Sequence, residues 1–170
     1  MIGLLRKKVT LVSYQPNWDK LYKREEKRLL SVIGSDVEDI QHIGSTAVPG
    51  IMAKPIIDIA IGVKHFSTCK KCIKPIEKLG YKYAKGAGMV KSRYLFVKGS
   101  KKGITHHLHL VKLNERSWKN CILFRDYLRK HKIAVKEYNR LKKKLAKKYK
   151  NDRDTYTVKK SYFIKKILDS

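Results

Sequence analysis

The segment from Ile56 to Val63 constrains the fold more than any other part of the chain. It is a near-continuous apolar run, which is typical of a strand whose two faces are both covered by other elements. Asp58 interrupts this run, and burying a carboxylate without a partner costs several kcal/mol. We therefore expect a central strand in a covered sheet, with a cation or hydrogen-bond donors close to Asp58.

Other segments predict the remaining strands of that sheet. Alternating or continuous apolar patterns predict strands over residues 9–14, 37–43, 81–84, 93–98 and 105–113. Gly86 and Gly88 predict a glycine-rich turn between two of them, and residues 100–103 predict a polar turn.

Helical spacing of apolar residues predicts helices over 18–33, 66–79 and, near the C-terminal end, 157–168. We expect Asn17 to cap the first of these helices and Gly34 to end it. Pro75 should kink or break the second helix. Asp154 or Thr155 should cap the last one.

The chain of 170 residues is therefore expected to form a single α+β domain. A mixed sheet with flanking helices should occupy residues 9–113, and a helical C-terminal third should occupy residues 114–170. No apolar stretch is long enough to span a bilayer, and no signal-peptide pattern follows Lys8. Three cysteines cannot all pair within the chain, so we expect a reduced, cytoplasmic protein.

The charge balance favours a polyanionic partner. Lysine and arginine number 41 against 14 acidic residues, which gives a formal net charge of +27. This balance argues against a calcium buffer or an acidic tail protein, and it fits a partner such as nucleic acid, a nucleotide or a phosphorylated metabolite. A lysine-rich genome-wide composition is the alternative explanation for most of the excess.

The turn Gly44-Ser45-Thr46 has the residue types of a phosphate-binding loop. Glycine lets the backbone approach a phosphate closely, and hydroxyls and backbone N–H groups can bond its oxygens. Asp58 on the next strand could hold a divalent cation beside the phosphate, and Lys54 could neutralise further charge. The alternative is a tight turn between two core strands, with Asp58 hydrogen-bonded at a strand end.

Three histidines lie within the four residues from His106 to His109. Strand alternation places His107 and His109 on one face and His106 on the other. Two imidazoles on one face could chelate a metal, or supply a base and a phosphate donor. The alternative is a pair of partly buried, hydrogen-bonded histidines.

Two further patterns have structural explanations. Cys69 and Cys72 form a CxxC pair, but both fall on the apolar face of a helix and no second pair exists, so we expect core packing. The lysine-rich stretch 142–150 could track phosphates, but the solvated side of an amphipathic helix is the favoured interpretation.

Together these segments resemble the GrpB family, within the DNA polymerase β-like nucleotidyltransferase superfamily. The run from His42 to Ile59 carries most of the resemblance. The supporting matches are Tyr14-x-Pro16-x-Trp18, Gly80-Tyr81, residues 106–109, residues 124–129, Tyr138-x-x-Leu141-Lys142, Asp152-Arg153 and Tyr156.

The resemblance implies a nucleotidyltransferase-like fold with a Gly-Ser turn and three carboxylates that hold two magnesium ions. Gly44 and Ser45 fit the turn, and Asp58 fits the first carboxylate. Ala60 stands where a second acid is expected, and the strand over 105–113 holds no acid. Ile104 also stands where many relatives have an arginine.

We therefore expect a nucleotide or another phosphorylated ligand in a cleft, with metal-dependent nucleotidyl transfer to an unknown acceptor as the reaction. The expected catalytic residues are Asp58, His107 and His109. Asp58 and His109 would hold Mg²⁺ or Mn²⁺. The expected nucleotide contacts are Gly44, Ser45, Thr46, Lys54, Arg93, Arg125 and Lys142.

Two alternatives remain open from the sequence. One is a non-catalytic basic module that binds RNA or a protein partner, which the missing acids and the lysine excess favour. The other is a phosphodiesterase-like hydrolase that uses the His107 and His109 pair.

Overall fold

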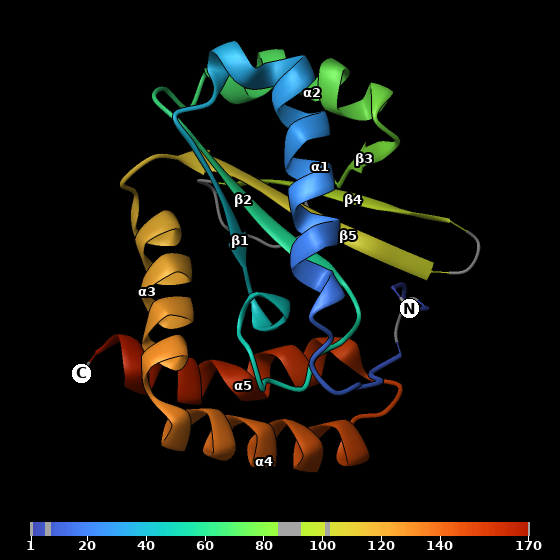
Figure 1. Cartoon of the computed structure of the whole chain (residues 1–170), viewed down its shortest axis with the longest axis vertical. Coiled ribbons are helices and arrows are strands. Elements are labelled where there is room, and N and C mark those ends of the chain that lie inside the picture. Colours follow the sequence, from blue (N-terminus) through green and yellow to red (C-terminus); the bar gives the residue numbers. More distant parts are fainter. Residues whose placement is uncertain (1, 6–7, 85–92, 101–102, 170) are drawn as a thin grey trace.

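A five-stranded mixed sheet in the order β1-β2-β5-β4-β3 lies at the centre of the computed structural model (Figure 1). The structure describes residues 2–5, 8–84, 93–100 and 103–169. The strands are β1 (Asp39–Ile43), β2 (Ile57–Val63), β3 (Tyr81–Tyr83), β4 (Arg93–Ser100) and β5 (Gly103–Lys112). β2 and β5 run parallel and the other pairs run antiparallel, so the predicted α+β class with a mixed sheet is confirmed.

Helices flank this sheet and form the C-terminal third. They are α1 (Asn17–Ile33), α2 (Thr68–Lys78), α3 (Arg116–Lys130), α4 (Lys132–Lys148) and α5 (Arg153–Leu168). α3 runs alongside the sheet, and α4 and α5 lie across the end of the molecule where β1 leads into a short turn (Figure 1). None of the helices in the described ranges is both long and apolar enough to cross a membrane.

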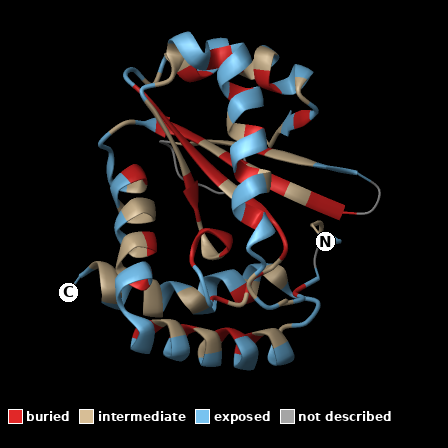
Figure 2. Ribbon diagram, in the orientation of Figure 1, coloured by how far each residue is buried: buried red, intermediate tan, exposed pale blue. Residues whose placement is uncertain are grey.

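The main core lies between the sheet and the pair α1 and α2. β2 is buried along almost its whole length (Figure 2), as its apolar run predicts. Leu108 and Leu110 of β5 point into this core, together with the fully buried Cys69 and Cys72 of α2. The alternation of β5 and the packing role of the two cysteines are therefore both confirmed.

The ends of several elements differ from the sequence predictions. Residues 9–14 form no strand; Val12 makes a single bridge to Ala53 instead. Asn17 is the first residue of α1 rather than its cap, and Pro16 occupies the cap position. α1 ends at Ile33 with Gly34 at the cap position, as predicted, although Gly34 keeps right-handed helical dihedrals and begins a 3₁₀ turn. The predicted turn at residues 86–88 lies outside the described residues.

The last helix begins four residues earlier than predicted. Asp152 is its N-cap, and its side chain accepts a hydrogen bond from the backbone N–H of Thr155 at 3.0 Å. Asp154 and Thr155 therefore lie inside α5 rather than capping it. The earlier start also places Arg153 at the first position of the helix.

A buried ion pair ties α1 to the sheet on the side away from the helical third. Glu25 of α1 has a side chain that is only 4% exposed, and Lys98 of β4 donates to it at 2.6 Å. Burial alone would raise the pKa of the Glu25 carboxyl, but the hydrogen bond and charge of Lys98 hold that pKa below its usual value.

We expect Lys98→Met to lower the free energy of unfolding by about 3 kcal/mol, because it removes the shorter of the two ion pairs of the buried Glu25 carboxylate and leaves the pair with the half-exposed Arg28. The double variant Glu25→Leu/Lys98→Met should cost much less, since it removes both charges. Urea denaturation of the three proteins measures this difference. A double variant as unstable as the single one would contradict the expectation.

Candidate functional site

A cavity of about 490 Å³ lies between the sheet and the helical third. Its walls come from the turn after β1, from β2 and β5, and from α3, α4 and α5. The residues with polar or charged groups that line it are Gly44, Ser45, Thr46, Lys54, Asp58, His107, His109, Asn120, Cys121, Tyr138, Lys142, Arg153, Tyr156, Thr157 and Lys160. The structure thus brings the Gly-Ser turn, the acid and the two imidazoles together from distant parts of the sequence.

The turn after β1 lies directly against Asp58. β1 and β2 pair with Ile43 opposite Asp58, so the residue after Ile43 meets the carboxylate. Gly44 has a φ of 71°, and a Cβ at this position would lie 2.6 Å from Asp58 Oδ2. Position 44 therefore requires glycine both for its backbone conformation and for the close approach of the acid.

Asp58, His107 and Arg153 form a chain of hydrogen bonds. His107 Nδ1 lies 2.8 Å from Asp58 Oδ1, and Arg153 donates to His107 Nε2 at 3.0 Å. Because Arg153 has only donors, Nε2 must be the acceptor and Nδ1 must carry the proton. Burial would raise the pKa of the Asp58 carboxyl, but the hydrogen bond from His107 and the nearby basic groups, including Lys54, lower it to about 2.

His109 is a neutral imidazole beside this chain. Burial, and then the charge of Arg93, lower the pKa of His109 to about 3. Ala60, at the position predicted for a second acid, lies opposite His109 in the parallel pairing of β2 and β5. It is buried in an apolar cluster with Ile43, Val111 and Trp118, so a carboxylate at this position would lie among apolar side chains.

Three lysines from different elements enter the cavity. Lys142 of α4 is only 1% exposed and donates to Ser45 Oγ at 3.2 Å and to the carbonyl of Met52. Lys54 and Lys160 lie 5.6 and 4.5 Å from the centre of the Tyr156 ring. Lys142, one of the expected nucleotide contacts, thus faces inward. The solvated face predicted for the lysine-rich stretch is present at Lys143, Lys144, Lys147 and Lys148, which are exposed.

The pKa values of these amines are lowered. Burial, and then the charges of Lys160 and Lys54, lower the pKa of Lys142 to about 6. Burial, and then the charges of Arg153 and Lys160, lower the pKa of Lys54 to about 7. Burial lowers the pKa of Lys160 to about 8, although the charge of Asp58 opposes this. These lowered pKa values show that basic side chains crowd together in a cavity whose described lining supplies one carboxylate.

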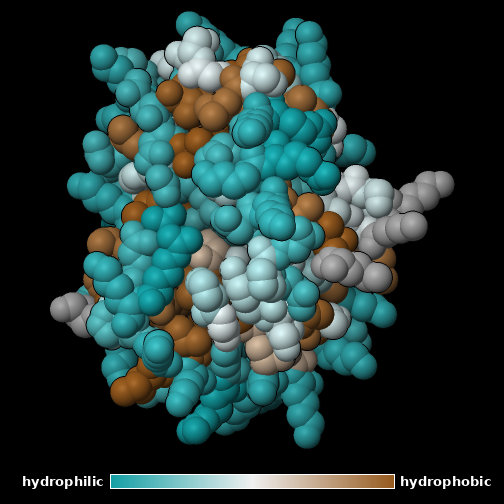
Figure 3. All heavy atoms as spheres, in the orientation of Figure 1, coloured by the Kyte–Doolittle hydropathy of each residue, from teal (hydrophilic) through white to brown (hydrophobic). Residues whose placement is uncertain are grey.

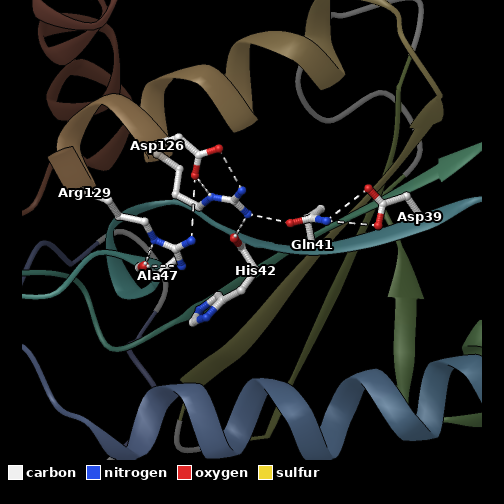
Figure 4. Close-up of polar contacts among 7 residues, drawn as sticks. Asp39, Gln41, His42, Ala47, Asp126 and Arg129 are labelled. Carbon is white, nitrogen blue, oxygen red and sulfur yellow. Dashed lines mark hydrogen bonds and ion pairs between the residues drawn. The ribbon is translucent and has the colours of Figure 1, made fainter.

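Two of the predicted nucleotide contacts, Arg125 and Thr46, have other polar partners, and Arg93 lies outside the cavity lining. Arg125 lies outside the cavity lining; it is buried and donates to Gln41 Oε1 and to the His42 carbonyl at 2.7 and 2.9 Å (Figure 4). Arg93 is not part of the lining either, although its charge acts on His109. Thr46 lines the cavity, but its buried hydroxyl lies 3.0 Å from His42 Nε2.

Sequence reasoning missed Arg153, Tyr156 and Lys160 as parts of the site. Arg153 and Tyr156 belong to the motifs of the family resemblance, but their chemistry was not assigned. The spacing of the three positions places them on one face of α5. The sequence prediction begins this helix at residue 157, after Arg153 and Tyr156, so it does not reveal the shared face.

The residues of this site do not suit the pair of magnesium ions that the resemblance implies. Among the described residues that line the cavity, Asp58 carries the one carboxylate. Within the same described ranges, no group of three or more histidine, cysteine, aspartate or glutamate side chains is placed to hold a metal ion. Two-metal sites in such reactions depend on several carboxylate oxygens.

Comparisons with known proteins identify the family. Residues 8–170 match the family model described as GrpB protein. The glutamate-rich protein GrpB of Alkalihalophilus pseudofirmus is 38% identical over 99% of both chains. The UPF0157 protein YqkA of Bacillus subtilis is 36% identical over 94% of this chain, which spans 46% of that protein.

Solved structures agree with this assignment. The crystal structure of a GrpB protein from Enterococcus faecalis superposes with a TM-score of 0.84 and 32% identity, over 93% of this chain and 94% of that chain. The nucleotidyltransferase-like Cid1, in complex with its product ApU, superposes with a TM-score of 0.53 at 14% identity, over 79% of this chain and 42% of that one; this likeness concerns the fold alone. The chain therefore belongs to the GrpB family and has a nucleotidyltransferase-like fold.

Proposed function

We propose that the cavity binds the phosphate groups of a nucleotide or of another phosphorylated small molecule. The observation that carries this proposal is the convergence of Lys54, Lys142, Lys160 and Arg153 on one cavity, whose lining, as far as the structure describes it, contains one carboxylate. Clefts lined by charge of one sign concentrate ligands of the opposite sign.

Electrostatic interactions with the cavity lysines would favour the binding of a phosphorylated ligand. The pKa values of the three lysines are lowered by burial and by positive neighbours, so their ammonium forms are disfavoured in the empty cavity. A phosphate chain would supply the missing negative charge and accept charge-assisted hydrogen bonds. Ser45 Oγ, already bonded to Lys142, adds a hydroxyl to the same wall.

The rest of the cavity suits the non-phosphate part of the ligand. Phe124, Tyr138, Tyr156, Ile164 and Leu168 supply an apolar and aromatic wall. Aromatic rings can stack on a nucleobase. A volume of about 490 Å³ also lies within the range of ordinary small-molecule sites.

Nucleotidyl transfer to an unidentified acceptor is the reaction that the fold favours. Structures of the Cid1 poly(U) polymerase hold a UTP analogue and MgGTP, so nucleoside triphosphates are the first ligands to test here. A single carboxylate argues against transfer by two metal ions. We therefore propose the binding of a phosphorylated ligand first, and nucleotidyl transfer as a further step that the same cavity would support.

We expect the full chain to bind ATP, GTP, CTP or UTP, and the variant Lys160→Met to weaken that binding at least about tenfold by removing a cavity cation. Lys159→Met is the matched control, because this neighbouring lysine is exposed. Isothermal titration calorimetry measures both affinities. Equal losses in the two variants would contradict binding in this cavity.

Binding should also depend on pH through the lowered lysine pKa values. Between about pH 7.5 and about pH 9 the phosphates of ATP stay ionised, while Lys160, with a pKa of about 8, loses its proton. We expect the affinity for ATP to fall about tenfold over this range, and the fall to be smaller in Lys160→Met. An affinity that is constant over the same range would argue against the lysine contacts.

RNA binding by α4 is a second candidate function. The exposed face of this helix carries Lys143, Lys144, Lys147 and Lys148, and hydrophilic side chains cover the end of the molecule where α4 lies (Figure 3). Lysines arranged along one face can contact a phosphate backbone without base recognition.

Charge reversal of these four lysines to glutamate separates the two candidates. If RNA is the partner, the variant should lose single-stranded RNA affinity, and the wild-type affinity should fall steeply with salt. Nucleotide binding in the cavity should be unaffected. Fluorescence anisotropy with a labelled oligonucleotide at two salt concentrations is the measurement, and unchanged RNA affinity in the variant would rule out this face.

A further inference from the structure

We propose that the cavity holds the phosphate groups of its ligand directly through Lys54, Lys142, Lys160 and Arg153, without a bridging divalent cation. This inference rests on the proposed phosphate-binding function and specifies how that function is achieved. It departs from the two-magnesium arrangement that the family resemblance implies.

The single carboxylate is poorly placed to hold magnesium. Mg²⁺ prefers near-octahedral coordination by oxygen, usually with one or two carboxylates and several waters. Asp58 Oδ1 accepts the hydrogen bond from His107, and the backbone of Gly44 lies so close to Oδ2 that a Cβ there would be 2.6 Å away. Both carboxylate oxygens therefore already have close neighbours.

The positions next to Asp58 offer no replacement for the missing acids. Ala60 on the same face of β2 is sealed in the apolar cluster with Trp118. Both ring nitrogens of His107 have polar partners, Asp58 and Arg153. His109 retains an imidazole, but nitrogen ligands suit zinc, copper or iron better than magnesium.

Side chains that can carry positive charge stand in the cavity in place of metal ions. Three lysine amines and the guanidinium of Arg153 line it, and the described lining has one carboxylate. A phosphate chain would favour the protonated form of these amines, whereas a divalent cation would be repelled by the guanidinium and by each amine that is protonated. Arginine and lysine also make short, charge-assisted hydrogen bonds to phosphate oxygens.

The first test is calorimetric titration of the full chain with ATP and with inorganic tripolyphosphate, once in EDTA and once in excess Mg²⁺. We expect affinities in EDTA that equal or exceed those in Mg²⁺, because magnesium neutralises part of the charge that the lysines recognise. Binding at least about tenfold tighter in Mg²⁺ would overturn the inference and leave the proposed function intact. No binding of either ligand in either buffer would overturn the proposed function, and the inference with it.

The second test asks whether the substitution Asp58→Asn weakens or tightens the binding of ATP. If a metal ion on Asp58 held the phosphates, this substitution should abolish ligand binding. If the lysines hold them, it should tighten binding about threefold or more, because the one negative charge in the lining is removed. Asn keeps an acceptor for His107, so the local hydrogen bond can persist.

Asp36→Asn is the matched control for charge, since Asp36 lies in the turn after α1 and does not line the cavity. Circular dichroism and thermal melting of both variants check that they are folded. A folded Asp58→Asn protein with weaker ATP affinity than wild type would overturn the inference, whereas tighter binding in this variant alone would support it.

Discussion

The close approach of Gly44 to Asp58 determines the geometry of the whole site. The antiparallel register of β1 and β2 places Ile43 opposite Asp58, and the chain then turns over the carboxylate with a backbone conformation that favours glycine. This turn presents Ser45 to Lys142 of α4 and so connects the sheet to the helical third. The site therefore depends on a close contact between the Gly44 backbone and the Asp58 carboxylate. Any residue larger than glycine at position 44 would prevent this contact.

The second constraint is the electrostatic imbalance inside the cavity. Most lysines of this chain are exposed and solvated, so each contributes little to local structure. Lys54, Lys142 and Lys160 differ because helices and sheet shield them from water and from counter-ions, and their pKa values fall accordingly. The net charge of +27 comes mostly from exposed side chains, whereas these three amines are the basis of the proposed phosphate binding in the cavity.

Much of the fold follows from the sequence, because local patterns decide it. The apolar run of β2, the alternation of β5 and the helical spacing of α1 and α2 each reflect burial on a fixed face. Residues 9–14 have a strand-like pattern, but they meet the rest of the protein through one bridge at Val12, and tertiary pairing cannot be read from such a short pattern.

The sequence predicts only part of the site, because tertiary packing decides which of several similar side chains face the cavity. Asp58, His107 and the turn at Gly44 carry distinctive residue types, and the structure brings them together. Lys142 is one lysine in a run of similar ones, and only the packing of α4 decides that it faces inward. Arg125 looks like a phosphate ligand in sequence, but its guanidinium is engaged by Gln41, His42 and Asp126 inside the protein.

A nucleotidyltransferase-like fold does not by itself determine the chemistry of the site. Here the position of a second acid belongs to an apolar cluster around Trp118, which stabilises the contact between α3 and the sheet. Burying a second charge at that point would require a partner that the cluster does not contain. The apolar cluster and the cavity lysines therefore agree with one interpretation of the site. The cluster occupies the position where a second metal-binding carboxylate is expected, and the lysines and Arg153 offer basic groups where metal ions would otherwise supply positive charge.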